Sequence, residues 1–191
     1  MESLATPLMG EVGREAMGEP RRSLDRDQIE EAIREIHPAC FGWALACCGH
    51  QREEAEDVLQ TSYLKALDGK ATFNGSSSVK TWMFGVVRKT ASERRRHDLL
   101  RRLVPRHLHE EEAPAPSPEA LASDHEVHAH LRALLERLSS RQRELLHLVY
   151  YQELSIEEAS EVLGISLGSA RTHYARGKQR LRALLNGASQ P

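Results

Sequence analysis

Residues 155–181, SIEEASEVLGISLGSARTHYARGKQRL, contain two helical patterns separated by a short turn. Ser155 followed by Glu158 has the form of a capping box, which begins a helix because the two side chains satisfy otherwise unpaired backbone N–H groups. Gly164 suits the left-handed backbone position that ends a helix, and Ser166 is placed to cap the next one. Two helices joined by so short a turn predict a helix-turn-helix.

The second helix of this motif is basic. No acidic residue follows Glu161, whereas five Arg or Lys residues do. In a helix-turn-helix, exposed side chains near the start of the second helix reach base edges, and later basic side chains reach phosphates. The motif spans 156–182, and its candidate DNA contacts are Ser166, Ser169, Arg171, Thr172, His173, Arg176 and Lys178.

The charge of the chain is unevenly distributed, although the net charge is only -2. Eight basic residues and two acids lie between Arg88 and Arg106, while the acids gather at 53–57, 110–112 and 153–161. This segregation indicates separate surfaces for a polyanion and for a different kind of partner.

The composition predicts an all-α protein. Ala, Leu, Glu and Arg dominate, and only 5% of the 191 residues are aromatic. No apolar window is long enough to cross a membrane, and the N-terminal residues lack the pattern of a secretory signal. Three cysteines, two of them adjacent, make a poor disulfide framework and favour the reducing cytoplasm.

Helical periodicity divides the chain into two units. Three apolar stripes with steps of three and four predict three helices over 25–100, with a kink or brief interruption of the first at Pro38. Residues 1–24 have no periodicity and predict a disordered extension. Residues 101–124 contain four prolines and a triple Glu, which predict a flexible linker that does not fix the separation of the units. The second unit is predicted over 125–187.

Three segments carry a resemblance to a known family. AEDVLQTSYLKAL (55–67), FNGSSSVKTWMFGVVRK (73–89) and the stretch 138–185 closely resemble bacterial RNA polymerase sigma factors of the extracytoplasmic-function (ECF) group. The resemblance implies two small helical domains. The unit 25–100 is similar to sigma region 2, which docks on the polymerase and melts the -10 promoter element. The unit 125–187 is similar to region 4, which reads the -35 element.

The same resemblance implies two sets of site residues in the first unit. The set expected to bind core polymerase is Ala55, Glu56, Asp57, Val58 and Gln60. The set expected to bind the -10 element is Phe73, Asn74, Gly75, Ser76, Ser77, Lys80, Arg88 and Lys89. A Gly/Ser loop suits this task because melted DNA needs a pocket for an unstacked base. Trp82 begins an apolar stripe and is interpreted as a core residue.

The implied function is that of an ECF sigma factor, which directs core RNA polymerase to promoters and helps to open the duplex. The implied partners are the clamp of the largest polymerase subunit, the polymerase flap and promoter DNA, with an anti-sigma factor as a further candidate. An alternative remains open: a self-contained helix-turn-helix regulator whose first unit senses a ligand or oligomerises. Comigration with core polymerase distinguishes the two.

Enzymatic and metal-binding functions find little support in the sequence. It contains no Gly-x-Gly-x-x-Gly, P-loop or Gly-x-Ser-x-Gly motif, so neither catalysis nor a cofactor is expected. One segment does contain metal-ligand residue types, but it lacks the short Cys-x-x-Cys spacing of a zinc knuckle. These residues, interpreted as buried thiols and ordinary histidines without a metal, are His37, Cys40, Cys47, Cys48 and His50.

Overall fold

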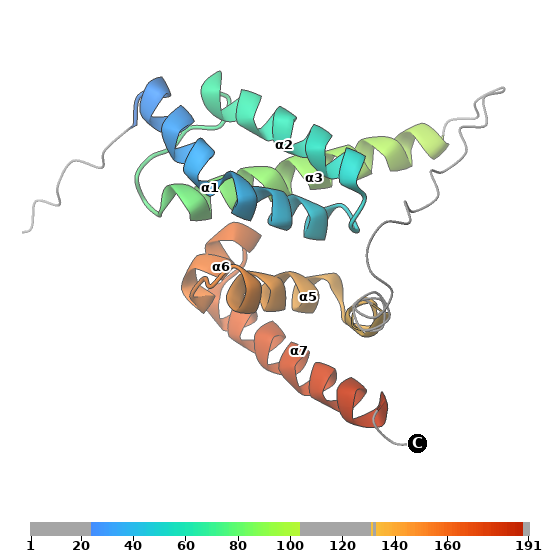
Figure 1. The fold of residues 1–191 in the computed structure, drawn as a ribbon. Coiled ribbons are helices and arrows are strands. Elements are labelled where there is room, and N and C mark those ends of the chain that lie inside the picture. The colour runs from blue at the N-terminus through green and yellow to red at the C-terminus, as the bar shows by residue number, and fades with distance from the viewer. Residues whose placement is uncertain (1–23, 104–130, 132, 189–191) are drawn as a thin grey trace, which may run out of the picture.

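The computed structural model describes residues 24–103, 131 and 133–188, and all regular structure within those residues is helical (Figure 1). The helices are α1 (Arg26–Cys47), α2 (Arg52–Leu67), α3 (Val79–Leu103), α5 (Ser140–Leu146), the π-helix η1 (His147–Tyr151), α6 (Ile156–Leu163) and α7 (Leu167–Ala188). The all-α prediction is confirmed. The predicted N-terminal extension and most of the predicted linker lie outside the described residues.

Local capping interactions begin the helices as the sequence predicts. The Ser155 hydroxyl accepts a bond of 3.1 Å from the Glu158 backbone, and the Glu158 carboxylate accepts one of 2.9 Å from the Ser155 N–H. A capping box at Asp25, which was not predicted, begins α1. Gly164 ends α6 with a φ of 60°. The brief interruption allowed for at Pro38 does not occur, because α1 continues unbroken from Arg26 to Cys47.

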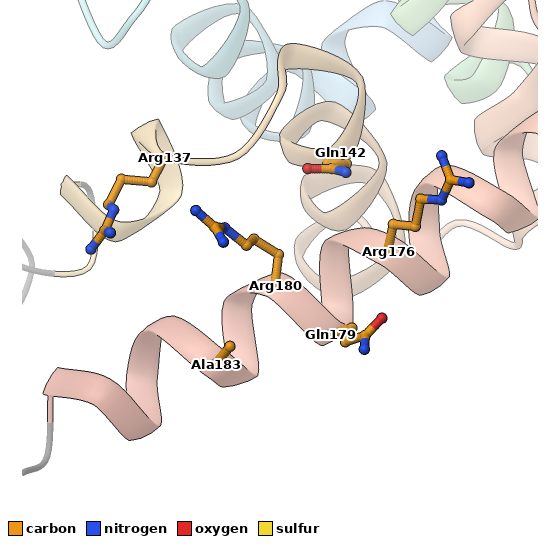
Figure 2. A pocket seen from close by; sticks show the side chains of 6 residues that line it. All are labelled: Arg137, Gln142, Arg176, Gln179, Arg180 and Ala183. Atoms are coloured by element: carbon orange, nitrogen blue, oxygen red, sulfur yellow. The ribbon is translucent and has the colours of Figure 1, made fainter.

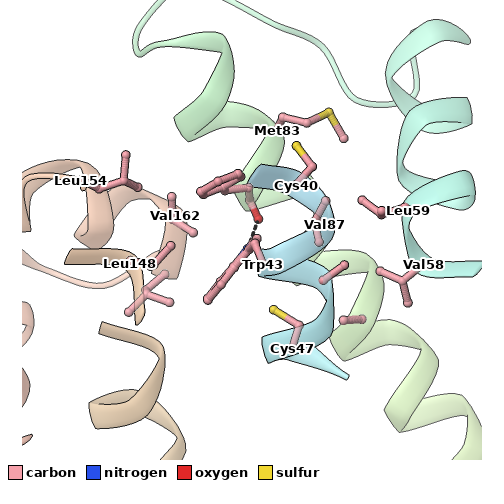
Figure 3. Packing of buried hydrophobic residues seen from close by; sticks show 14 of the residues in the cluster. Cys40, Trp43, Cys47, Val58, Leu59, Met83, Val87, Leu148, Leu154 and Val162 are labelled. Atoms are coloured by element: carbon pink, nitrogen blue, oxygen red, sulfur yellow. Dashed lines mark hydrogen bonds between the residues drawn. The ribbon is translucent and has the colours of Figure 1, made fainter. Parts of the chain in front are cut away.

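Trp43 is the largest fully buried side chain of the first unit. Its indole N–H donates a bond of 3.0 Å to the carbonyl oxygen of Phe84, which ties α1 to α3 (Figure 3). The two rings lie 6.0 Å apart between centroids. A buried indole needs such a partner for its N–H, because an unpaired buried donor costs stability.

The two units pack on each other and share one hydrophobic core. Helix α6 contacts α3, and η1 contacts α1 (Figure 1). Leu148, Leu154 and Val162 of the second unit face the side of the first unit that contains Trp43 (Figure 3), and all belong to one buried cluster with it. The sequence, with its predicted flexible linker, indicated two separately cored units and gave no sign of this contact.

A smaller cluster holds the second unit together away from this contact. It is built from Leu134, Leu138, Leu146 and Leu184. These side chains fix α7 against α5, so that the length of α7 extends away from the first unit (Figure 1). The packing of these leucines therefore holds α7 in place and leaves its outward face exposed.

Candidate nucleic-acid interface

The loop before α3 and the side of α3 form a groove of about 760 Å³. Phe73 packs against Trp82 at its edge, with ring centroids 5.3 Å apart. The groove is lined by Lys65, Lys70, Ala71, Thr72, Ser76, Ser77, Thr81, Trp82, Gly85, Val86, Lys89, Thr90, Glu93 and Glu161. Ser76, Ser77 and Lys89 belong to the predicted -10 set, so three of its members meet in one groove.

The tip of this loop is held by one asparagine. The Asn74 side-chain oxygen accepts bonds of 3.0 Å from the Ser76 N–H and 2.6 Å from the Ser76 hydroxyl. Gly75 between them has a φ of 69°, a backbone position that favours glycine. The loop is thus preorganised, with Asn74 and Ser76 exposed at its tip.

Trp82 differs from its expected role as a core residue. It is half-buried, touching the core on one side and lining the groove on the other. Full burial in this part of α3 falls instead to Met83, Phe84 and Val87. The reason is helical periodicity: a side chain at the margin of the buried face packs on the core with one side and remains exposed to solvent on the other.

An ion pair that the sequence did not indicate lies in the groove. The Lys65 ammonium is 2.7 Å from the Glu93 carboxylate and donates a bond of 3.1 Å to the Thr90 hydroxyl. The hydrogen bond from Lys65 lowers the pKa of Glu93. The pair joins the end of α2 to α3 and leaves Lys89 as the exposed cation of the predicted -10 set.

Lys80 and Arg88 are not open to solvent in the way that Lys89 is. The Lys80 ammonium donates a bond of 2.7 Å to the carbonyl oxygen of Gln152. Arg88 lies 3.4 Å from the Glu144 carboxylate and donates a bond of 3.3 Å to the carbonyl oxygen of Leu163. Two of the three cations of the predicted -10 set, Lys80 and Arg88, therefore contact the second unit.

The predicted -35 residues divide between two sides of α7. At 3.6 residues per turn, Ser169, Thr172 and Arg176 share one side, whereas Lys178 lies about 200° around from Arg176. Lys178 packs over the Tyr174 ring at 5.3 Å from its centroid. Arg171 pairs with Glu157 at 3.1 Å. The other two have different positions: Ser166 caps α7, since its hydroxyl accepts a bond of 3.2 Å from the Ser169 N–H, and His173 is half-buried.

A polar pocket of about 420 Å³ extends the side that contains Arg176 (Figure 2). Figure 2 shows the Arg180 side chain extending towards Arg137 from the opposite wall. The lining residues are Arg137, Gln142, Arg176, Gln179, Arg180 and Ala183. Neither Arg137 nor Arg180 belongs to the predicted -35 set. Arg180 lies one helical turn after Arg176, and this spacing in the sequence could have indicated that it faces the same side of α7.

The acidic residues of α2 face outward. Glu56, Asp57 and Gln60 are exposed, whereas Ala55 and Val58 have no exposed surface. Asp57 accepts a bond of 2.8 Å from Arg94 on α3. Within this predicted polymerase-binding set, only Glu56, Asp57 and Gln60 are therefore able to contact a partner directly. Ala55 and Val58 are buried and position the helix.

The three cysteines are free and buried, as predicted. Burial raises the pKa of Cys40 to about 12 and that of Cys48 to about 11, so both are protonated, unreactive thiols near neutral pH. Within the described residues no group of three or more His, Cys, Asp or Glu side chains is placed to hold a metal ion. Among those same residues no helix is long and apolar enough to span a membrane.

Comparison with known proteins supplies the family. The family model for Sigma-70 region 2 matches residues 32–105, and that for Sigma-70 region 4 matches residues 128–181. The RNA polymerase sigma factor YlaC of Bacillus subtilis is 30% identical over 159 residues, which cover 82% of this chain and 91% of YlaC. The ECF RNA polymerase sigma factor EcfG of Rhodopseudomonas palustris is 27% identical, over 83% of this chain and 86% of EcfG.

This chain belongs to the ECF group of RNA polymerase sigma factors. As a sigma factor it binds core RNA polymerase and directs it to promoter DNA, and the alternative of a self-contained regulator is not favoured. The fold is similar to that of the sigma factor RpoE in its complex with the anti-sigma factor NepR from Bartonella quintana. The TM-score is 0.61 at 24% identity, over 82% of this chain and 96% of that one.

Proposed function

We propose that this sigma factor opens promoters by placing an unstacked -10 base in the groove beside α3. The observation that carries the proposal is the joint position of the Phe73–Trp82 pair, the Asn74 loop and Lys89 around one groove. An aromatic edge provides a stacking surface for a base of any sequence, and a lysine next to it supplies charge for the backbone phosphate. Serine hydroxyls at the loop add hydrogen-bond partners for the base edge.

The side of α7 with Ser169, Thr172 and Arg176 is proposed to read the -35 element. Short polar side chains and an arginine on one exposed helix face are suited to base edges in the major groove. Arg137 and Arg180, which line the adjoining pocket, are proposed to hold a phosphate and so fix the register of the helix on the duplex. Arg171, which is exposed, is proposed to contact a flanking phosphate, whereas Lys178 lies on the other side of α7 over the Tyr174 ring.

Core polymerase is proposed to contact the exposed acids of α2. Glu56, Asp57 and Gln60 form a polar surface on a helix whose apolar side is buried, which suits a protein partner better than a phosphate backbone. The site of action would be the bacterial cytoplasm, where core polymerase is present. An anti-sigma factor is also proposed as a partner, since the neighbouring solved structure of RpoE is a complex with one.

The proposal is tested by mixing the purified chain with core polymerase and a panel of promoter fragments. Comigration with core enzyme, followed by appearance of permanganate-reactive thymines in one of the fragments, is the expected result. Tight binding of duplex DNA by the chain alone, without comigration with core polymerase, would contradict it. A variant with Glu56→Gln and Gln60→Ala should comigrate more weakly, and Glu31→Gln on α1 is the matched surface control.

A further inference from the structure

A glycine sets the distance between two walls of the polar pocket beside α7. A Cβ atom on Gly177 would lie 3.3 Å from the Cβ of Gln142 and 3.4 Å from the Cδ1 of Leu146, so a side chain there would press α7 away from α5. Because no side chain separates the two helices, α7 carries Arg176 and Arg180 close to Gln142 (Figure 2). The pocket of about 420 Å³ is therefore built by helix packing.

The charge of this pocket is positive. Arg137 enters it from the residues before α5, opposite Arg180 of α7, and Arg176 adds a third guanidinium group (Figure 2). Its six lining residues include no carboxylate. Among the described residues, the arginines that form ion pairs are others, namely Arg34, Arg52, Arg88, Arg94, Arg141 and Arg171. Three guanidinium groups therefore line one cavity without a described acid paired to any of them.

The uncharged lining of the pocket adds a hydrogen-bond donor. The side-chain oxygen of Gln142 accepts a bond of 3.2 Å from the Ser139 N–H, which leaves the amide N–H groups of Gln142 for a ligand. Guanidinium groups donate paired hydrogen bonds that match the spacing of phosphate oxygens. The donors and the charge together indicate a site for phosphoryl groups.

A single backbone phosphate of DNA does not match this lining. It carries one negative charge, whereas the pocket carries three positive charges. A short stretch of duplex is also stiff and convex, so its successive phosphates cannot enter one cavity together. A chain of linked phosphoryl groups supplies several charges within a volume typical of small-molecule sites. Since no aromatic side chain lines the pocket to stack on a base, the phosphate chain itself is the part recognised.

We propose that this pocket binds a soluble oligophosphate, a chain of linked phosphoryl groups that is either inorganic or carried by a nucleotide, and that the bound ligand excludes the -35 duplex. The exclusion rests on the proposed function of Arg176 and Arg180 at that element, whereas the binding itself does not. An oligophosphate held by these two arginines takes up the side chains that α7 would present to DNA. Promoter recognition then falls as the concentration of oligophosphate rises.

The binding site is tested on the full chain in the absence of DNA and polymerase. Sodium tripolyphosphate, ATP and adenosine are each titrated into the chain by calorimetry, at fixed ionic strength and without magnesium. The variant Arg137→Gln/Arg180→Gln removes two charges from the pocket. Its charge-matched control, Arg26→Gln/Arg182→Gln, removes two exposed arginines that do not line it. Circular dichroism verifies that both variants keep the helix content of the unaltered chain.

Tripolyphosphate should bind the unaltered chain at one site. The pocket variant should lower the affinity at least about 10-fold and the control less than about 2-fold, because only the first removes charge-assisted hydrogen bonds to the ligand. ATP should bind about as tightly as tripolyphosphate, and adenosine should not bind. Equal losses in the two double variants would reduce the effect to net charge and overturn the inference. Binding of ATP without binding of tripolyphosphate would overturn recognition through the phosphate chain.

Competition with DNA is measured on the complex of the chain with core polymerase and a promoter duplex, at fixed ionic strength and free magnesium. Tripolyphosphate should weaken promoter binding over the concentrations that fill the pocket. The complex made with Arg137→Gln/Arg180→Gln should need about 10-fold more tripolyphosphate, which separates this site from phosphate sites on the polymerase. Filling of the pocket without loss of promoter binding would overturn the exclusion. Failure of the chain to comigrate with core polymerase would instead contradict the proposed function, and the calorimetry would still decide whether the site exists.

Discussion

At the scale of single residues, the loop before α3 depends on Asn74. Its side chain accepts both bonds from Ser76, so Asn74→Ala leaves the loop tip without internal support. We expect this variant to lose most transcription from a duplex promoter, to retain more on a pre-melted template, and to comigrate normally with core polymerase. Equal activity of the variant on the two templates, measured by abortive transcription, would count against the loop assignment.

Arg180 provides a second residue-scale prediction. Arg180→Ala should weaken binding of promoter duplex by the complex of the chain with core polymerase, by a similar factor for all DNA sequences. It should also reduce the slope of the logarithm of the binding constant against the logarithm of salt concentration by about 1, as expected for a phosphate contact. Arg182→Ala is the matched control, because Arg182 lies about 200° around α7 from Arg180. A sequence-dependent loss for Arg180→Ala would mean that this side chain reads a base.

At the scale of elements, the start of α6 rests on one capping box. Ser155→Ala removes the acceptor for the Glu158 backbone N–H and should lower the free energy of unfolding by about 1 kcal/mol, measured by urea denaturation. Ser166→Ala at the start of α7 should behave similarly. A change within error for both variants would show that packing alone determines where these helices begin.

The same box predicts a pH dependence. Bonds from Ser155 lower the pKa of Glu158, so its contribution to stability is present above pH 4.5 and is lost as the pH falls through the lower folded-state value. In Ser155→Ala this acid-side loss should be smaller. Urea titrations at several pH values between neutral and acidic conditions measure the difference.

These caps show how far the sequence determined the fold. The caps at Ser155 and Ser166 are local, since each side chain meets a backbone group three residues away, and both were predicted correctly. Trp43 was missed from the core because its partner, Phe84, is 41 positions distant. The π-helix η1 was also not predicted, since this kind of helix is rare and no pattern in the sequence indicated it.

The parts of the candidate site that consist of consecutive residues could also be predicted from the sequence. The loop around Asn74 and the exposed side of α7 followed from contiguous motifs. Arg137 was missed because only the packing of the second unit brings it to Arg180. The contact of Arg88 with Glu144 joins residues 56 positions apart, and no local pattern contains it.

At the scale of the whole molecule, the contact between the regions buries a histidine. Burial lowers the pKa of His147 to about 4, below its ordinary 6.5. The folded state keeps this ring neutral while the unfolded chain takes up a proton, so stability is full above pH 6.5 and falls as the pH drops towards 4. Between pH 6.5 and 5 the loss should be about 2 kcal/mol.

Denaturation of His147→Phe over the same pH range measures this contribution. The variant should show a flatter profile between pH 6.5 and 5, whatever its absolute stability. A slope equal to that of the unaltered chain would place the titration elsewhere. The window stays above the range in which most carboxylates titrate, which keeps the histidine effect separate.

The positions of the two tryptophans allow their intrinsic fluorescence to report on the conformation of the molecule. Trp43 is wholly buried at the contact between the regions, and Trp82 lies at the edge of the groove beside Phe73. Since the chain contains no other tryptophan, removing either indole leaves a single emitter. Separation of the regions should shift the Trp43 emission to the red, and a base stacked at the groove should quench Trp82. The order of the two signals after mixing with polymerase and promoter would reveal which event comes first.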